Sequence, residues 1–260
     1  MKYKAILICL TIVVIFSCKK KEKKSEEMAG PQSPPTTCDT NHVFALELNG
    51  NVIDESCNPV SCTSNNLNYV NDRNGNSIKA ISFNGTSSSL QLPNTTKIHP
   101  NFPFTVAFWV NPTDSSATSN YFVQSQAGSN YFGYWIHAVP GSGQVVANFG
   151  DGSGNTSASR RTQLSSYILR SNMWTHVSIV YSSATQTKMF FNGVEDLGST
   201  GSGSATSIVY EFISNTSAIG RIGGYFSTAP FYFSGKMDKV KIWKKALSQT
   251  EIQNEYSSTN

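Results

Sequence analysis

Short stretches of alternating polarity, separated by turn residues, dominate this chain. Between residues 43 and 243, stretches rich in β-branched and aromatic residues recur between clusters of Gly, Asn, Ser and Pro, and no long helical pattern interrupts them. Residues 104–110 are the clearest example, because strand side chains alternate between two faces and one face here is wholly apolar. That face carries Phe104, Val106, Phe108 and Val110. Many such strands predict an all-β fold, a two-sheet antiparallel jelly-roll sandwich.

Two Asn-Gly pairs predict tight turns between strands. Residues 174–181 alternate in polarity and lead into a second strand, after which Asn192-Gly193 supplies the two positive-φ residues of a type I′ hairpin turn. Asn84-Gly85 repeats the signal earlier in the chain, between two expected strands at residues 80–83 and 90–92. The sequence therefore predicts consecutive hairpins.

The last residues follow helix rules instead. Ser248 and Glu251 have the spacing of a capping box, and Leu247 and Ile252 occupy the two positions of a hydrophobic staple. We therefore expect a short C-terminal helix from residue 249 to about residue 256. Such a helix can cover a sheet edge.

The beginning of the chain has the layout of an export signal. Lys2 and Lys4 precede an apolar run, residues 5–16, that is too short to span a bilayer as a helix. The residues that follow, 19–41, are rich in lysine, glutamate and proline and contain almost nothing that could enter a core. We expect a signal peptide at residues 1–18, a flexible tether at 19–41 and one domain at 42–260.

The positive charge of the chain lies in these N-terminal segments. The whole sequence has 20 basic and 16 acidic residues, and Lys2, Lys4, five further lysines and three glutamates fall within its first 27 residues. From Met28 onward, 13 basic residues therefore balance 13 acidic ones. Nucleic-acid binding requires a basic face, so we expect no nucleic-acid partner.

Three cysteines remain after residue 18, and an odd number outside the cytoplasm leaves the pairing open. We expect Cys57 and Cys62, which flank a four-residue loop, to form a disulfide. A bridge from Cys38 to either of them is the alternative. No nearby pair of histidines supports a metal role for these cysteines.

The end of the apolar run, Ile15-Phe16-Ser17-Cys18, resembles the lipobox of bacterial lipoproteins. In that motif the cysteine is acylated and becomes the mature N-terminus. The resemblance implies that Cys18 carries a lipid anchor, because several acyl chains hold a protein stably where one chain binds only marginally. We expect the mature protein to be tethered to a membrane of the bacterial cell envelope, with the outer membrane favoured and its periplasmic or surface face undecided.

The later segments, taken in order, resemble the concanavalin A-like lectin/glucanase superfamily in its laminin G-like form. The matching segments are residues 48–56, 72–76, 81–85, 104–110, 174–177, 191–193, 219–221 and 235–243, followed by 246–248. Together they cover nearly all of residues 43–256. The resemblance implies a jelly-roll fold and recognition of a glycan, a polysaccharide or an envelope protein, although one fold hosts many functions.

The resemblance also implies a structural calcium ion between an early loop and the last strand. Alternation places Asp238 on the core-facing side with Val240 and Ile242, where a charge must be paired, hydrogen-bonded or metal-bound. Calcium prefers six to eight oxygen ligands. The expected side-chain ligands are Asn51, Asp54 and Asp238. The alternative is that Asp238 accepts backbone amides or pairs with Arg73 or Arg221.

A saccharide site needs an exposed aromatic ring beside polar groups, because sugar rings present apolar faces and hydroxyl edges. The candidates lie in two clusters, Tyr131, Tyr134 and Trp135 in the first and Tyr225, Phe226, Phe231 and Tyr232 in the second. Among these we favour Trp135 and Tyr225. The alternative is that these rings belong to the core, as most strand aromatics do.

The sequence does not contain the spacing of catalytic residues that enzymes of this superfamily use. Glycosidases of this superfamily carry a Glu-x-Asp-x-x-Glu strand that places two carboxylates on one face, and this spacing does not occur. Residues 151–155 look like a calcium loop but lack its alternating oxygen ligands and predict a turn. We expect a non-catalytic carbohydrate-binding domain; a protein-binding or adhesion domain is the alternative, and a hydrolase or lyase is a weaker one.

Overall fold

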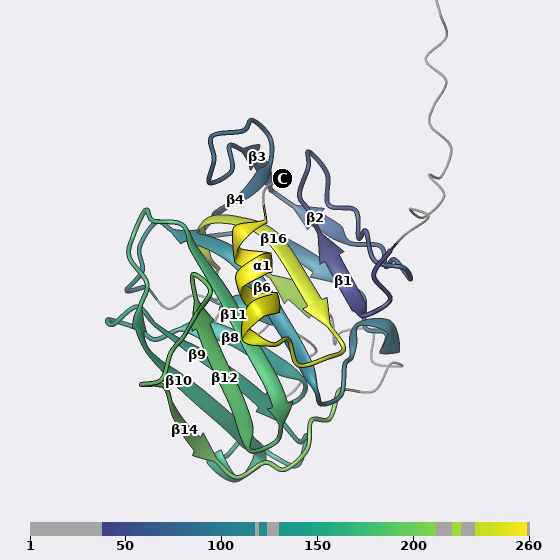
Figure 1. The fold of residues 1–260 in the computed structure, drawn as a ribbon, viewed down its shortest axis with the longest axis vertical. Coiled ribbons are helices and arrows are strands. Elements are labelled where there is room, and N and C mark those ends of the chain that lie inside the picture. Colours follow the sequence, from purple (N-terminus) through teal and green to yellow (C-terminus); the bar gives the residue numbers. More distant parts are fainter. Residues whose placement is uncertain (1–37, 118–119, 124–129, 212–219, 225–231, 259–260) are drawn as a thin grey trace, which may run out of the picture. The chain divides into compact units, whose positions relative to one another are not determined.

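The fold is a sandwich of two antiparallel sheets, seen in a computed structural model that describes residues 38–117, 120–123, 130–211, 220–224 and 232–258 (Figure 1). These residues belong to one compact unit, Pro34–Asn260. Each sheet has eight strands within the described residues. The predicted all-β jelly-roll sandwich is therefore confirmed.

Sheet A is centred on two long strands, β6 and β16. Its order is β13-β12-β11-β6-β16-β4-β3, and β1 pairs with the second half of β16. Its strands are β1 (His42–Leu46), β3 (Asn68–Val70), β4 (Ala80–Asn84), β6 (Phe104–Pro112), β11 (Thr175–Ser183), β12 (Gln186–Phe191), β13 (Val194–Glu195) and β16 (Ser234–Trp243).

Sheet B has the order β14-β10-β9-β8-β7-β15-β5-β2. Its strands are β2 (Thr63–Asn65), β5 (Ser89–Leu92), β7 (Asn120–Val123), β8 (Tyr134–Ala138), β9 (Gln144–Gly150), β10 (Arg160–Ile168), β14 (Thr200–Gly203) and β15 (Gly220–Ile222). Two 3₁₀ turns, η1 (Thr96–Ile98) and η2 (Ser157–Ser159), lie in its connections, and α1 (Gln249–Ser257) follows β16.

The core lies between the sheets and uses alternate residues of their strands. All four apolar residues predicted for one face of β6 are buried in it, which confirms the alternation assigned to that strand. Sheet A also contributes Val177, Ile179 and Tyr181, and sheet B contributes Tyr134, Ile136 and Ala138. The residues between these positions face outward from each sheet.

One of the two predicted turns is confirmed, and the other connects strands of different sheets. Asn192 and Gly193 have φ angles of 51° and 78°, as the type I′ turn between β12 and β13 requires. At the earlier pair only Gly85 has positive φ, at 76°, and Asn84 stays in β4. The Asn84 side-chain oxygen accepts hydrogen bonds from the backbone of residues 86–88, which widens the loop. The prediction of a hairpin there was wrong, because this loop carries the chain from sheet A to sheet B.

A bulge in β16 reverses the direction predicted for Asp238. The register shifts between Asp238 and Lys241, and Lys239 has a φ of 46°. Met237 and Val240, three residues apart, both enter the core, so Asp238 points to the outer face with Lys241. The prediction that Asp238 shares the core-facing side with Val240 was wrong, because one extra residue in a strand inverts the alternation beyond it.

Helix α1 begins as predicted but covers a sheet face rather than an edge. Ser248 and Glu251 form the capping box, and Leu247 and Ile252 are buried together. Their apolar partners come from four strands of sheet A, through Ala107, Val180, Phe190 and Trp243. Figure 1 shows the helix lying across these strands. The outer face of sheet A is therefore largely occupied, whereas that of sheet B carries polar and aromatic side chains.

Candidate functional site

Two of the predicted aromatic residues meet on the outer face of sheet B. Trp135 lies on β8 between the core residues Tyr134 and Ile136, so its indole points away from the core. The Tyr131 ring stacks on it, with centroids 5.2 Å apart and an interplanar angle of 26°. Because Trp135 is only 6% exposed, the half-buried Tyr131 is the ring that a ligand can contact.

A positively charged side chain completes this aromatic pair. Arg160, the first residue of β10, donates a hydrogen bond from Nη1 to the Tyr131 hydroxyl at 3.0 Å. Its guanidinium also lies 5.2 Å from the centroid of the Tyr131 ring. These contacts hold the hydroxyl end of Tyr131 beside a cation while its ring stacks on the Trp135 indole, which favours an ordered aromatic surface.

A row of polar side chains runs beside the aromatic pair. Trp135, Asn148 and Thr162 are direct cross-strand neighbours on β8, β9 and β10. Thr162 Oγ1 donates to Asn148 Oδ1 at 2.7 Å, and Asn148 Nδ2 lies 3.4 Å from His137 Nδ1. We call the six residues Tyr131, Trp135, His137, Asn148, Arg160 and Thr162 the outer-face cluster. It combines flat rings with amide, hydroxyl and imidazole groups, as saccharide sites do.

The histidine of the outer-face cluster is neutral at physiological pH. Burial, together with the positive charge of Arg160, lowers the pKa of His137 to about 4. A neutral ring that accepts from Asn148 at Nδ1 carries its proton on Nε2. His137 can therefore donate one hydrogen bond to a ligand hydroxyl without adding charge to this face.

The turn after β9 holds Tyr131 in place. The Tyr131 N–H donates to Gly154 O, and Gly152 N–H donates to Tyr131 O, both at 2.8 Å. A Cβ at Gly150 would lie 2.3 Å from that tyrosine carbonyl oxygen, so only glycine permits the approach. Asp151 accepts from the N–H of Ser153 within the turn, at 2.9 Å. Residues 151–155 thus form the predicted turn, and it positions an aromatic side chain.

The other predicted aromatic residues do not join the outer-face cluster. Tyr134 is fully buried in the core, with its ring 5.2 Å from that of Phe104. Tyr232 is half-buried and pairs through its backbone with Gly224. Tyr225, Phe226 and Phe231 lie outside the described residues.

Sequence reasoning missed the polar half of the outer-face cluster. Alternation along β9 could have placed Asn148 on the outward side, since Ala147 and Phe149 are apolar. The register that brings Asn148 between Trp135 and Thr162 depends on pairing across three strands, which one sequence does not specify.

The residues proposed as calcium ligands are engaged by hydrogen-bond donors. Asp54 is 3% exposed, and each of its oxygens accepts two hydrogen bonds. The donors are the N–H groups of Ala45, Ser56 and Val60 and the Ser56 hydroxyl, at 2.9 to 3.0 Å. Asn51 Oδ1 accepts from Ile53 N–H at 3.0 Å. This donor set does not fit a calcium ion, because N–H and O–H groups occupy the positions in which a cation would lie.

Asp238 pairs with an arginine, as the alternative prediction stated. Arg73 Nη1 lies 2.7 Å from Asp238 Oδ2, and the Arg73 guanidinium also donates to Ser258 O at 2.6 Å. Asp238 is fully buried, and burial raises its pKa to about 7 against the opposing effect of the Arg73 charge. Among the described residues, no group of three or more His, Cys, Asp or Glu side chains could hold a metal ion.

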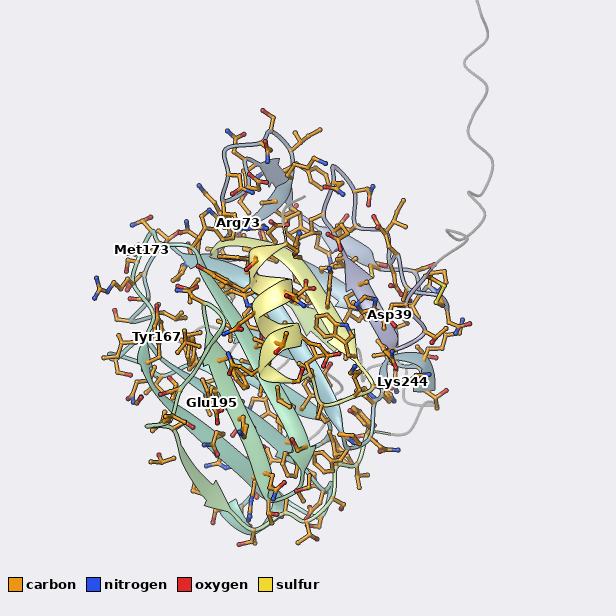
Figure 2. The ribbon with its side chains drawn as sticks, viewed as in Figure 1. Asp39, Arg73, Tyr167, Met173, Glu195 and Lys244 are labelled. Carbon is orange, nitrogen blue, oxygen red and sulfur yellow. A yellow bond between two sulfur atoms is a disulfide. The ribbon has the colours of Figure 1, made fainter. Side chains whose placement is uncertain are left out.

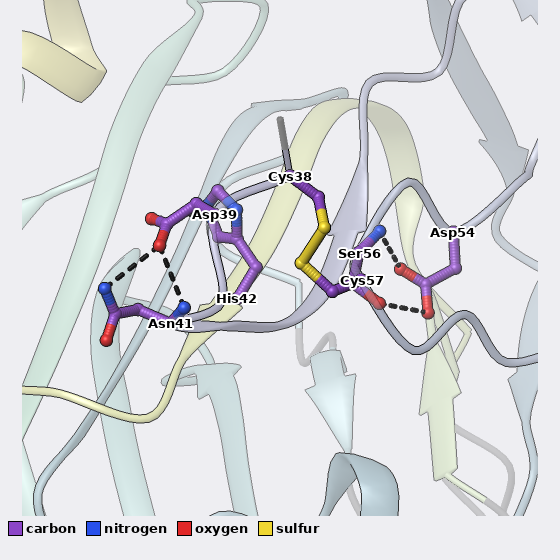
Figure 3. Close-up of a disulfide and its surroundings, with 7 residues drawn as sticks. All are labelled: Cys38, Asp39, Asn41, His42, Asp54, Ser56 and Cys57. Atoms are coloured by element: carbon purple, nitrogen blue, oxygen red, sulfur yellow. Dashed lines mark hydrogen bonds and ion pairs between the residues drawn. A yellow bond between two sulfur atoms is a disulfide. The ribbon is translucent and has the colours of Figure 1, made fainter. Parts of the chain in front are cut away.

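The disulfide differs from the favoured prediction (Figure 3). Cys57 pairs with Cys38 rather than with Cys62, which is a free, half-buried thiol. The loop that Asp54 organises holds Ser56 and Cys57 beside the start of β1, where Cys38 arrives. Burial and the nearby Asp54 charge raise the pKa of Cys62 to about 12, so it is a protonated thiol at neutral pH.

No helix in the described part of the chain is both long and apolar enough to cross a bilayer. The fold and the outer-face cluster thus define a jelly-roll sandwich with an aromatic and polar outer face.

Comparison with known proteins identifies the family of this sandwich. A family model described as the concanavalin A-like lectin/glucanases superfamily matches residues 84–253, which is more than half of the chain. The chain belongs to this superfamily, as its motifs predicted. No curated protein matches it closely enough to count as a relative.

Solved structures share the fold at low sequence identity. Domain 4 of AbnA, a GH43 extracellular arabinanase from Geobacillus stearothermophilus in complex with arabinotriose, has 17% identity and a TM-score of 0.58, over 84% of this chain and 98% of that one. The binding domain of botulinum neurotoxin serotype G has 15% identity and a TM-score of 0.60, over 83% of this chain. The binding domain of Paraclostridial Mosquitocidal Protein 1 has 17% identity and a TM-score of 0.58. The chain spans about half the length of the two toxin binding domains.

Proposed function

We propose that this protein is a non-catalytic carbohydrate-binding domain that a lipid anchor holds at the bacterial cell envelope. The observation that carries the proposal is the outer-face cluster, in which a stacked Tyr131–Trp135 pair lies beside Arg160 and the Asn148–Thr162 hydrogen bond. A sugar ring packs its apolar face on an aromatic ring and exchanges hydrogen bonds at its edge. The arabinotriose complex of a structurally similar domain supports this ligand class.

The residues of the cluster have separate roles in this proposal. Tyr131 provides the ring that the sugar contacts, and Trp135 holds this ring in place by stacking on it. Arg160, Thr162 and the Nε2–H of His137 supply polar contacts to sugar hydroxyls. No bond is broken in the ligand, because nothing in this set pairs an acid with a base or nucleophile.

The experiment is binding of the full chain to a broad glycan and polysaccharide array, repeated with Tyr131→Ala. We expect specific binding that weakens about tenfold in the variant, which corresponds to about 1.4 kcal/mol for the lost stacking contact. Tyr69→Ala is the matched control, since Tyr69 is 38% exposed on β3 of the other sheet. Equal loss in both variants would show that the cluster is not the site.

The second candidate function is binding of an envelope protein. It is favoured by exposed apolar side chains at the edge of sheet A, where Val194 on β13 is 66% exposed and Leu197 after it is 86% exposed. Edge strands of this kind can pair with a strand of another chain. Folded protein that binds no glycan but retains an envelope protein would favour this function.

The lipid anchor is proposed from the sequence alone, because residues 1–37 lie outside the described residues. Cys18→Ala removes the only acylation site that the lipobox offers. We predict that the parent incorporates a labelled fatty acid and sediments with membranes, whereas the variant does neither, because membrane binding needs the acyl chains. A variant that still sediments with membranes, under conditions that release peripheral proteins, would contradict the anchor.

A further inference from the structure

Trp174 differs from the other three tryptophans of the chain. Trp109, Trp135 and Trp243 are 7%, 6% and 4% exposed, and each packs against another aromatic ring at a centroid distance of 5.0 to 5.4 Å. Trp174 is half-buried, and no described residue stacks on its ring or hydrogen-bonds its N–H. Its indole therefore presents a face and a donor that the fold itself does not use.

Two hollows adjoin at Trp174. One, of about 390 Å³, lies at the C-terminal end of α1 and is lined by Arg73, Asn74, Trp109 and Tyr256. The other, of about 460 Å³, lies at the end of β10 and is lined by Tyr167, Arg170, Met173 and Asn192. Both volumes fall in the range of small-ligand sites. We call the two hollows together the Trp174 groove; Figure 2 shows Arg73 near the end of α1 and Met173 and Tyr167 along the neighbouring side.

The walls of the Trp174 groove are held rigidly. Arg73 is fixed by Asp238 at 2.7 Å and lies 4.4 Å from the centre of the Trp109 ring. Tyr167 stacks on Phe191, with centroids 4.3 Å apart and an interplanar angle of 6°. The turn before Trp174 is pinned by the hydrogen bond from Asn172 N to Pro112 O, at 2.7 Å. Preorganised walls of this kind lower the entropy lost on binding.

The charge of the groove favours an anionic ligand. Its described lining contains two arginines and no carboxylate. Asp238 neutralises Arg73, but Arg170 is exposed and no described carboxylate lies within ion-pair distance of it. Asn192 also has a donor to offer, because its side-chain oxygen accepts from His176 N–H and its NH₂ group has no described partner. A guanidinium and an amide beside an unstacked indole suit an acidic sugar better than a neutral one.

We propose that the Trp174 groove binds an acidic oligosaccharide. A sugar ring packs on the Trp174 indole, and the carboxylate or sulfate of the same chain pairs with Arg170. The site is separate from the outer-face cluster and shares no residue with it, so it stands whether or not that cluster binds a glycan. A protein docked on Ile168 and Met173, which are 54% and 51% exposed, is the other occupant that the test distinguishes.

The test follows the indole N–H signals of ¹⁵N-labelled full chain by NMR. Four tryptophans give four such signals, and Trp174→Phe and Trp135→Phe assign the two that report on the groove and on the outer-face cluster. The titrants are a uronate oligosaccharide with its methyl ester, and a sulfated oligosaccharide with its desulfated form. Each pair differs only in charge, and the two pairs distinguish carboxylate from sulfate.

We expect an acidic member to shift the Trp174 signal with at least tenfold higher affinity than its uncharged partner. Arg170→Gln should remove that difference, whereas Lys97→Gln, which loses the same charge at an exposed position in η1, should keep it. The proposal is overturned if no acidic sugar shifts the signal, if charged and uncharged forms shift it equally, or if Arg170→Gln binds like the parent. An unresponsive Trp174 signal in folded protein would favour the docked protein.

Discussion

At the scale of single residues, the carboxylate of Asp54 organises the first loop of the domain. It accepts hydrogen bonds from three N–H groups and one hydroxyl, which belong to Ala45, Ser56 and Val60, and it is almost fully buried. Hydrogen bonds to a charged group are the stronger ones, and donors left unsatisfied in the interior are costly. The loop that presents Cys57 to Cys38 therefore depends on one side chain.

This arrangement predicts a large loss of stability for Asp54→Ala. The free energy of unfolding in urea should fall by about 3 kcal/mol or more, because four donors lose their acceptor. Asn51→Ala, which removes the hydrogen bond that Asn51 accepts from Ile53 N–H and a long one that it donates to Asn49 O, should cost about 1 kcal/mol or less and serves as the control. The melting temperature of the parent should be equal with calcium and with chelator. A clear decrease in melting temperature on chelation would support the calcium ion predicted from the sequence.

One backbone position, Lys239, explains why alternation misplaced Asp238. The bulge at Lys239 has no signature in the sequence, since lysine is not a residue that favours positive φ. It turns Asp238 to the outer face, where Arg73 can reach it from a loop 165 residues earlier. Strand patterns predict which residues alternate, but a single inserted residue changes their direction and only the paired strands reveal it.

At the scale of elements, α1 acts as a cover for the outer face of sheet A. Its one fully buried residue, Ile252, packs with Leu247 against strands from across the sheet. Lys241 of β16 lies 2.9 Å from Glu255 of the helix, which adds an ion pair beneath it. The end of this helix also forms one wall of the Trp174 groove, through Tyr256.

Truncation of the helix contact should therefore be costly. We predict that Ile252→Ala lowers the free energy of unfolding by about 2 to 5 kcal/mol, because a buried side chain is replaced by a cavity. Gln253→Ala, at the neighbouring exposed position, should change it by less than about 0.5 kcal/mol. Chemical denaturation of both variants is the measurement. An equal effect of the two substitutions would mean that α1 does not pack on sheet A.

Elements with local signals were predictable from the sequence, and elements that depend on distant pairing were not. The capping box, the Asn192-Gly193 turn and the apolar face of β6 each lie within a few residues of chain. The hairpin predicted at Asn84-Gly85 was wrong because strand order decides whether two strands pair. The predicted Cys57–Cys62 disulfide was wrong because Cys38 reaches Cys57 only once the Asp54 loop is folded. The same limit hid Asn148, Arg160 and Trp174, whose neighbours come from other strands.

At the scale of the whole molecule, the two sheets leave different outer faces. Sheet A is covered by α1, whereas the outer face of sheet B carries Tyr131 and Trp135 among polar side chains. The described domain thus carries an ordered aromatic surface on one of its two outer faces. The proposed lipid anchor at Cys18 would hold such a surface near envelope polysaccharide.

The most direct test of this account is the glycan array with the parent chain and Tyr131→Ala, compared at equal folded fraction. The account predicts specific glycan binding by the parent that weakens about tenfold in Tyr131→Ala and is kept in Tyr69→Ala. Folded parent protein that binds no glycan on the array would contradict the carbohydrate-binding function.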